Sequence, residues 1–204
     1  MVNIMEDRQR SNLVFSLVAV ICFSQLSSVV DAQCVKIYDN KVTDRDIKII
    51  VNDHNSIRNR IASGTFPGLP RGKNFKQMKY DQRLAQEAQK IANSCRFAHQ
   101  KVNDGRWGWV GQNLYISMST ANSKGADWGA AVRSWSNEAK YYKYGGPVTS
   151  QNGHFTQMIW ADSEFIGCGY THYLSNDAKW KYKKLYVCNY GPGGNIQGRK
   201  PYQT

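Results

Sequence analysis

Apolar residues recur at helical spacing in three segments of the chain. In residues 42–64, isoleucine and valine side chains fall three or four positions apart, and Thr43 can cap the first turn. Residues 81–97 repeat this pattern behind a capping Asp81, and residues 126–142 carry a third apolar stripe. The pattern therefore predicts three amphipathic helices.

Strand-like segments fill the last third of the chain. Residues 155–160, 164–173 and 184–190 are rich in β-branched and aromatic side chains, and a polar stretch that separates the last two predicts a hairpin. We expect the first of these strands to begin at His154. Residues 104–117 mix turn residues with a strand-like end. Helices followed by strands favour an α+β fold, in which helices cover an antiparallel sheet.

Residues 1–32 have the pattern of a signal peptide. A basic start precedes the mostly apolar residues 13–26, and Val30 and Ala32 are suited to a cleavage site. The apolar run is shorter than the roughly 20 residues that a membrane-spanning helix needs. We therefore predict a secreted protein with one domain, residues 33–204, although a retained signal anchor is the alternative.

Cysteine usage agrees with export. Four cysteines remain after residue 32, an even number with three possible pairings in an oxidising compartment. The predicted hairpin favours a bridge between Cys168 and Cys188, which leaves Cys34 to pair with Cys95. The chain has no C-x-x-C motif, so a thiolate zinc site is not expected.

The chain is basic, with a formal net charge of +12. Such a charge favours sulphated glycans, acidic membrane surfaces or nucleic acid as partners. Export argues against nucleic acid, and residues 179–184, KWKYKK, are a candidate for contact with an anionic surface. The alternative is a basic surface without a dedicated partner.

Three polar residues fall on sides that the pattern turns inward. They are His54 in the first predicted helix, Glu138 in the third and His154. A buried carboxylate is costly unless it is paired, and histidines can serve as its partners or as metal ligands. The alternative is a hydrogen-bonded polar cluster that joins three elements of the fold.

Four sequence blocks resemble those of the CAP superfamily, which comprises cysteine-rich secretory, antigen 5 and pathogenesis-related 1 proteins. They are DHNSIR (53–58), GQNLY (111–115), GHFTQMIWADS (153–163) and LYVCNYGPGGNI (185–196). The chain most resembles insect antigen 5 proteins of venom or saliva. The resemblance implies a three-layer α-β-α sandwich with a central cleft that holds two histidines and two acidic residues.

Carried onto this chain, the resemblance assigns the histidines to His54 and His154 and one acid to Glu138. The second acid is replaced by Gln112, which cannot act as a general base. We therefore expect no enzyme activity and a weak zinc or copper site, with His54 and His154 as ligands and Glu138 and Gln112 behind them. A metal-dependent hydrolase or a copper-dependent superoxide scavenger is the alternative.

Tyr141, Tyr142 and Tyr144 lie in a loop just before the histidine of the third block. A similar aromatic loop is associated with sterol binding in some CAP members, and others bind fatty acids or leukotrienes in a channel between helices. The resemblance thus implies sequestration of a fatty acid, an eicosanoid or a sterol, and we expect the protein to be a monomer. The alternatives are a loop that packs on the sheet, and a surface-acting toxin or allergen with a protein target.

Overall fold

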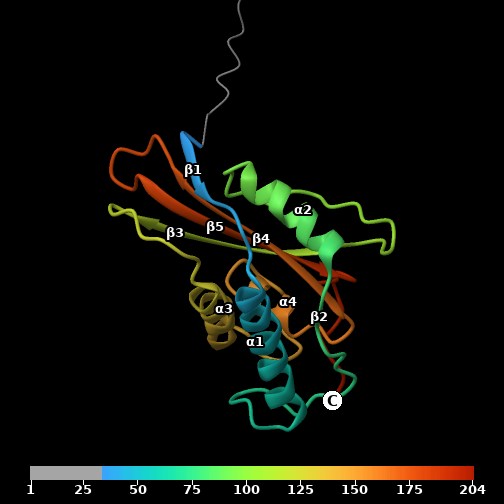
Figure 1. The fold of residues 1–204 in the computed structure, drawn as a ribbon. Coiled ribbons are helices and arrows are strands. Elements are labelled where there is room, and N and C mark those ends of the chain that lie inside the picture. Colours follow the sequence, from blue (N-terminus) through green and yellow to red (C-terminus); the bar gives the residue numbers. More distant parts are fainter. Residues whose placement is uncertain (1–33) are drawn as a thin grey trace, which may run out of the picture. The chain divides into compact units, whose positions relative to one another are not determined.

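A five-stranded sheet forms the centre of the protein in a computed structural model that describes residues 34–204 (Figure 1). Four strands follow the order β1-β4-β5-β3 with antiparallel pairing, and the short β2 pairs in parallel with β4. The predicted signal peptide, residues 1–32, lies outside the described part. The strands are β1 Lys36–Asp39, β2 Lys79–Tyr80, β3 Gly111–Ser119, β4 Phe165–Leu174 and β5 Tyr182–Gly191.

Helices cover both faces of this sheet. One face carries α2 with a smaller apolar cluster, and the other carries α1, α3 and α4 with a larger one (Figure 1). The α+β sandwich predicted from the sequence is therefore confirmed. Within residues 34–204, no helix combines the length and the apolar character needed to cross a bilayer. The helices are α1 Asp44–Ala62, α2 Gln82–Asn93, α3 Trp128–Ser136, the 3-10 helix η1 Asn137–Tyr141 and α4 Gly153–Met158.

The first two helices begin at the predicted caps. The Thr43 hydroxyl accepts a hydrogen bond from the Asp46 backbone N–H, and the Asp46 carboxylate accepts one from the Thr43 backbone N–H. The Asp81 carboxylate accepts the Leu84 backbone N–H in the same manner. Side-chain caps of this kind satisfy N–H groups that have no partner within the helix.

The third helical stretch and the first predicted strand differ from expectation. The helix α3 ends at Ser136 and continues as η1, so Glu138 lies in a tighter turn. The strand prediction for residues 155–160 is wrong, because residues 155–158 belong to the short helix α4, which begins at Gly153. Its side chains from Phe155 to Met158 are all buried. An apolar run that is buried on every side has no periodicity to separate helix from strand.

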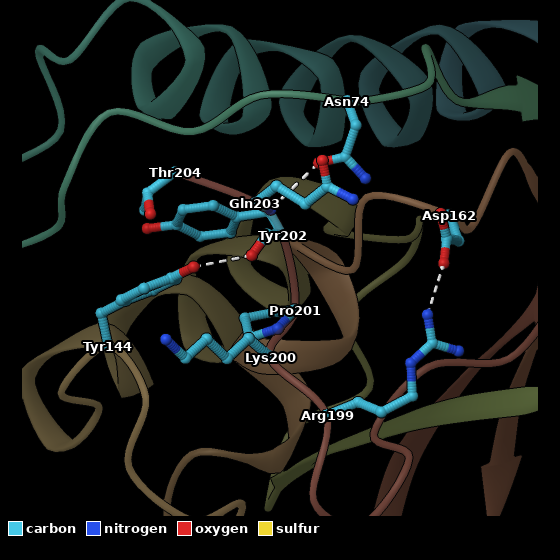
Figure 2. A pocket seen from close by; sticks show the side chains of 9 residues that line it. All are labelled: Asn74, Tyr144, Asp162, Arg199, Lys200, Pro201, Tyr202, Gln203 and Thr204. Atoms are coloured by element: carbon cyan, nitrogen blue, oxygen red, sulfur yellow. Dashed lines mark hydrogen bonds and ion pairs between the residues drawn. The ribbon is translucent and has the colours of Figure 1, made fainter.

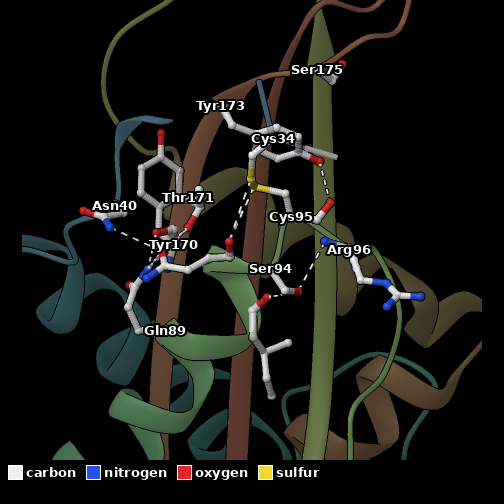
Figure 3. Close-up of a disulfide and its surroundings, with 12 residues drawn as sticks. Cys34, Asn40, Gln89, Ser94, Cys95, Arg96, Tyr170, Thr171, Tyr173 and Ser175 are labelled. Atoms are coloured by element: carbon white, nitrogen blue, oxygen red, sulfur yellow. Dashed lines mark hydrogen bonds between the residues drawn. A yellow bond between two sulfur atoms is a disulfide. The ribbon is translucent and has the colours of Figure 1, made fainter. Parts of the chain in front are cut away.

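One disulfide joins two neighbouring strands, and the other connects Cys34 to the segment after α2. Cys168 and Cys188 lie directly opposite each other in β4 and β5 and are bonded. Cys34 is bonded to Cys95 just after α2, where the Tyr173 hydroxyl donates to the Cys95 carbonyl (Figure 3). Both predicted pairings are confirmed.

A fully buried arginine connects α1 to the loop after α4. The Arg58 guanidinium donates to the carbonyl oxygens of Met158, Lys76, Ser163 and Trp160 at distances of 2.8 to 2.9 Å. Burial lowers the pKa of Arg58 to about 10. These contacts position α4, and with it the histidine at its start.

Candidate functional site

The histidine at the start of α4 forms a pair with the carboxylate of η1. His154 Nδ1 lies 2.6 Å from Glu138 Oε1. The other carboxylate oxygen, Glu138 Oε2, accepts the backbone N–H groups of His154 at 2.9 Å and Phe155 at 3.2 Å. One side chain therefore caps α4 and orients the imidazole ring at the same time.

In the His154 ring, Nε2 is the nitrogen that has no hydrogen-bond partner in the described part of the chain. An ionised carboxylate only accepts hydrogen bonds, so Nδ1 carries the proton in the neutral ring. No hydrogen bond to Nε2 occurs within residues 34–204. The ring stacks at 6.2 Å on Trp135, and the side chain is 28% exposed. The geometry thus presents Nε2 as a possible metal ligand.

The structure places His54 inside the core, with both ring nitrogens engaged. The Ile50 carbonyl oxygen can only accept, so His54 Nδ1 donates to it, over 2.7 Å. The Tyr190 hydroxyl then donates to Nε2 over 2.9 Å. Burial, with a smaller contribution from the nearby Arg58 charge, lowers the pKa of His54 to about 4. In this arrangement His54 offers no free nitrogen to a metal.

A hydrogen-bond chain connects the two histidines through β3 and β5. The Asn113 amide in β3 donates both to the Tyr190 hydroxyl and to the His154 carbonyl oxygen, each over 3.1 Å. The same hydroxyl contacts His54. The structure therefore joins His54 and His154 by a buried network and does not place them in one open cleft, where the resemblance had assigned both as ligands.

Gln112 has a different histidine as its neighbour. Its Oε1 accepts from His99 Nδ1 at 3.0 Å and from the Gln100 backbone N–H at 3.1 Å, and its Nε2 donates to Asn189 Oδ1 at 2.9 Å. Gln112 and the inward-facing Asn113 occupy successive positions of β3, so their side chains leave opposite faces of the sheet. Gln112 is thus not behind His54.

The sequence interpretation overlooked His99. Nδ1 of His99 contacts the side-chain oxygen of Gln112, just as Nδ1 of His154 contacts the side-chain oxygen of Glu138. Its position shortly before the GQNLY block was the available signal, but His99 lies outside any periodic segment. His99 and Gln112 border a cavity of about 410 Å³, together with Trp109, Gln157 and Asn195.

A larger groove runs between α1 and η1. Its volume is about 860 Å³, and its lining includes Ile57, Phe66, Leu69 and Tyr142. Phe155 of α4 packs against Phe66 with the rings tilted and their centroids 5.7 Å apart. Two cationic side chains, Arg60 and Lys140, also line the groove.

The structure separates the three loop tyrosines. Tyr142 is buried in the wall of the groove between α1 and η1, whereas Tyr141 is exposed, with Lys140 lying over its ring. The Tyr144 hydroxyl donates to the Tyr202 carbonyl over 2.7 Å, and the two tilted rings lie with their centroids 4.7 Å apart (Figure 2). Tyr144 therefore packs against the C-terminal segment beside a separate cavity of about 500 Å³.

The family model for the cysteine-rich secretory protein family, CAP, matches residues 51–190. These residues include most of the sheet, Gln112, and the Glu138–His154 pair. The chain belongs to the CAP family. Both disulfides are compatible with the oxidising compartments in which such bonds persist.

Two CAP relatives show which branch the chain resembles. The salivary antigen-5 of Triatoma infestans is 32% identical over an alignment that covers 96% of this chain and 87% of the relative. The venom allergen 5 of Vespula flavopilosa is 37% identical, with 80% and 82% covered. Proteins of saliva and venom are thus similar to this chain, as expected from its antigen 5 resemblance.

A solved CAP structure, that of NaASP2 with Zn²⁺, has the same fold. It superimposes with a TM-score of 0.65 at 25% identity, covering 81% of this chain and 89% of NaASP2. Within residues 34–204, no three histidine, cysteine, aspartate or glutamate side chains gather as they would around a metal ion. The imidazoles of His154 and His99 each have Nδ1 held by a neighbouring side-chain oxygen.

Proposed function

We propose that this CAP protein is secreted and sequesters a long-chain carboxylate, a fatty acid or an eicosanoid, in the groove between α1 and η1. The observation that carries the proposal is a mixed lining, in which apolar side chains lie beside two cations. Ile57, Phe66 and Leu69 offer apolar surface to a hydrocarbon chain, and Arg60 and Lys140 can pair with a carboxylate.

The size and composition of the groove support this ligand class. A volume of about 860 Å³ lies within the range of small-molecule sites, roughly 300 to 1,000 Å³. Arg60 lies over the Phe66 ring at 4.9 Å, so a cation and an apolar wall adjoin on one side. A sterol has no carboxylate, so this arrangement favours the fatty acid or eicosanoid over the sterol.

We further propose a weak divalent-metal site with His154 as a ligand. The Glu138 carboxylate holds Nδ1 and thereby orients the ring, which is the usual arrangement behind a metal-bound histidine. His99, held by Gln112, is the second imidazole arranged in this way. Each of these imidazoles supplies one protein ligand, fewer than the three or four of tight zinc sites, so zinc or copper should bind weakly. We propose no catalysis, since Gln112 supplies no general base.

The test uses the full-length, secreted, disulfide-intact chain as a monomer. Native mass spectrometry and fluorescent fatty-acid displacement are performed with oleate and, for comparison, with oleyl alcohol. We expect one oleate per chain and weaker binding of the alcohol. Replacing Arg60 and Lys140 together by glutamine should weaken oleate binding about tenfold, because two charge-assisted contacts are lost.

A matched variant controls for overall charge. Lys73 and Lys143 are exposed lysines outside the groove lining, and replacing both by glutamine removes the same charge. This control should bind oleate like the wild type. Equal weakening in both double variants, or no oleate binding to the wild type, would reject the proposal.

A further inference from the structure

Exposed apolar side chains gather at the hairpin end of the sheet, defined as residues 35–38, 117–124 and 174–184. The strand register brings these three segments together, because Lys36 pairs with Leu174 and Ser119 pairs with Tyr182 (Figure 1). Five large apolar side chains here are 37% to 52% exposed. They are Val35, Ile37, Tyr38, Met118 and Trp180.

The same end is strongly cationic. It contains six lysines and one carboxylate, Asp177, with Asp39 directly after its first segment. Asp177 is already paired with Lys183 at 3.1 Å, and Lys181 is exposed in the turn before β5. The six lysines are Lys36, Lys124, Lys179, Lys181, Lys183 and Lys184.

Lysines and aromatic rings are interleaved at this end. Lys179 lies over the Trp180 ring at 4.9 Å, and Lys36 lies over the Tyr38 ring at 5.4 Å. Tyr38 in turn contacts Tyr182 across the sheet, with ring centroids 5.9 Å apart. Aromatic rings prefer the boundary between headgroups and hydrocarbon, while lysine keeps its charge in the aqueous layer beside an apolar stem.

We propose that the hairpin end docks on the surface of an anionic phospholipid bilayer. The lysines supply charge complementarity to the headgroups, and Trp180, Tyr38 and Met118 supply apolar surface that enters the interface. A sulphated glycan would use the lysines but leave the apolar side chains without a function. The proposal goes beyond fatty-acid sequestration, because none of these residues lines the groove between α1 and η1.

The test measures partition of the full-length, disulfide-intact chain onto sedimented vesicles at 0.1 M salt. We expect binding to phosphatidylserine–phosphatidylcholine vesicles and little binding to pure phosphatidylcholine. Replacing Lys179 and Lys181 by glutamine should lower the partition coefficient about tenfold, since each lysine near an anionic surface adds to the electrostatic attraction between protein and membrane. Replacing Trp180 and Met118 by serine should lower it to a similar extent.

Matched controls separate this surface from charge alone and from the groove. Replacing Lys73 and Lys143 by glutamine removes two exposed lysines outside the hairpin end, and should leave partition unchanged. Heparin-agarose retention is measured for every variant. If only the lysine variant loses vesicle binding while the serine variant binds like the wild type, the surface fits a sulphated glycan and the proposal is overturned. Absence of binding to anionic vesicles also overturns it, whatever the result for oleate.

Discussion

His54 and His154 are both assigned by the family resemblance to one metal site, yet their environments differ in almost every respect. His54 is fully buried, and the His154 side chain is 28% exposed. In each ring Nδ1 is held by an oxygen, a backbone carbonyl for His54 and the Glu138 carboxylate for His154. The rings differ at Nε2, which accepts the Tyr190 hydroxyl in His54 and has no hydrogen-bond partner within residues 34–204 in His154.

This difference shows what turns an inward histidine into a binding site. A histidine whose two nitrogens are both satisfied within the core contributes to packing and remains neutral, because charging it would cost desolvation. A histidine with one nitrogen oriented by a carboxylate and the other near solvent can bind a ligand. Residue type and helical position do not separate a packing histidine from a ligand-binding one. The hydrogen-bond partner of the second ring nitrogen separates them.

The largest effect is expected from the arginine that packs with the buried histidine. Replacing Arg58 by methionine removes four hydrogen bonds to backbone carbonyls. The carbonyls of Met158, Lys76 and Ser163 then lose their donor, whereas the Trp160 carbonyl keeps the Ser163 backbone N–H. Unsatisfied buried acceptors cost about 1 to 3 kcal/mol each before relaxation, so we expect the free energy of unfolding to fall by about 4 kcal/mol. Urea denaturation of the disulfide-intact chain measures this change.

Arg60 provides the matched control on the same helix. It is exposed, and its replacement by methionine should change the free energy of unfolding by less than about 0.5 kcal/mol. If both variants lose similar stability, the buried network is not what holds α4 against α1.

Acid should destabilise the folded protein through the buried His54. Burial holds the pKa of His54 at about 4, below its unfolded value near 6.5, so the unfolded chain binds more protons between these values. This contribution to stability is complete above pH 6.5 and is lost as the pH falls to about 4. The lost stability should be about 3 kcal/mol.

The measurement is the difference between wild type and His54→Gln in urea denaturation from pH 7 to pH 4. Glutamine carries no proton in this range, so the wild type should lose more stability than the variant as the solution is acidified. Burial and the Lys184 charge also lower the pKa of His172, but this contribution is common to both proteins and cancels. Parallel curves would contradict the assignment of acid sensitivity to His54.

Metal binding by the partly exposed His154 is tested by replacing Glu138. In Glu138→Gln the amide can donate to His154 Nδ1, which moves the ring proton to Nε2 and removes the lone pair that a metal needs. We expect zinc affinity, measured by calorimetry, to fall about 10- to 100-fold. Glu87→Gln removes the same charge from an exposed pair with Lys90 and should leave zinc binding unchanged.

Much of the fold could be predicted because its signals are local. The caps Thr43 and Asp81, the hairpin, and the pairing of Cys168 with Cys188 follow from residues near one another in sequence. The helix α4 could not be predicted from local sequence, since its first turn is capped by a residue of a separate element. The Glu138 carboxylate of η1 accepts the backbone N–H groups of His154 and Phe155. The strand β1 has four largely exposed residues and therefore no apolar alternation.

The candidate site was predictable only in part. The Glu138–His154 pair follows from two inward positions, and the structure brings them together. The burial of His54 depends on Tyr190, which lies 136 residues away, and no local pattern reports it. His99 was overlooked because it lies in an irregular segment where periodicity carries no information.

The smallest expected effect concerns the other histidine pair, where an amide takes the place of a carboxylate. In Gln112→Glu the new carboxylate accepts from His99 Nδ1 and the Gln100 N–H, but the donations to Asn189 Oδ1 and the Gln100 carbonyl oxygen are lost. We expect zinc affinity to rise about threefold to tenfold, because a carboxylate supports a metal-bound imidazole better than an amide does. The two lost hydrogen bonds should together cost about 1 to 2 kcal/mol of stability. Calorimetry with zinc in the wild-type and His99→Ala backgrounds measures the effect, and an equal gain in both backgrounds would show that Gln112 does not act through His99.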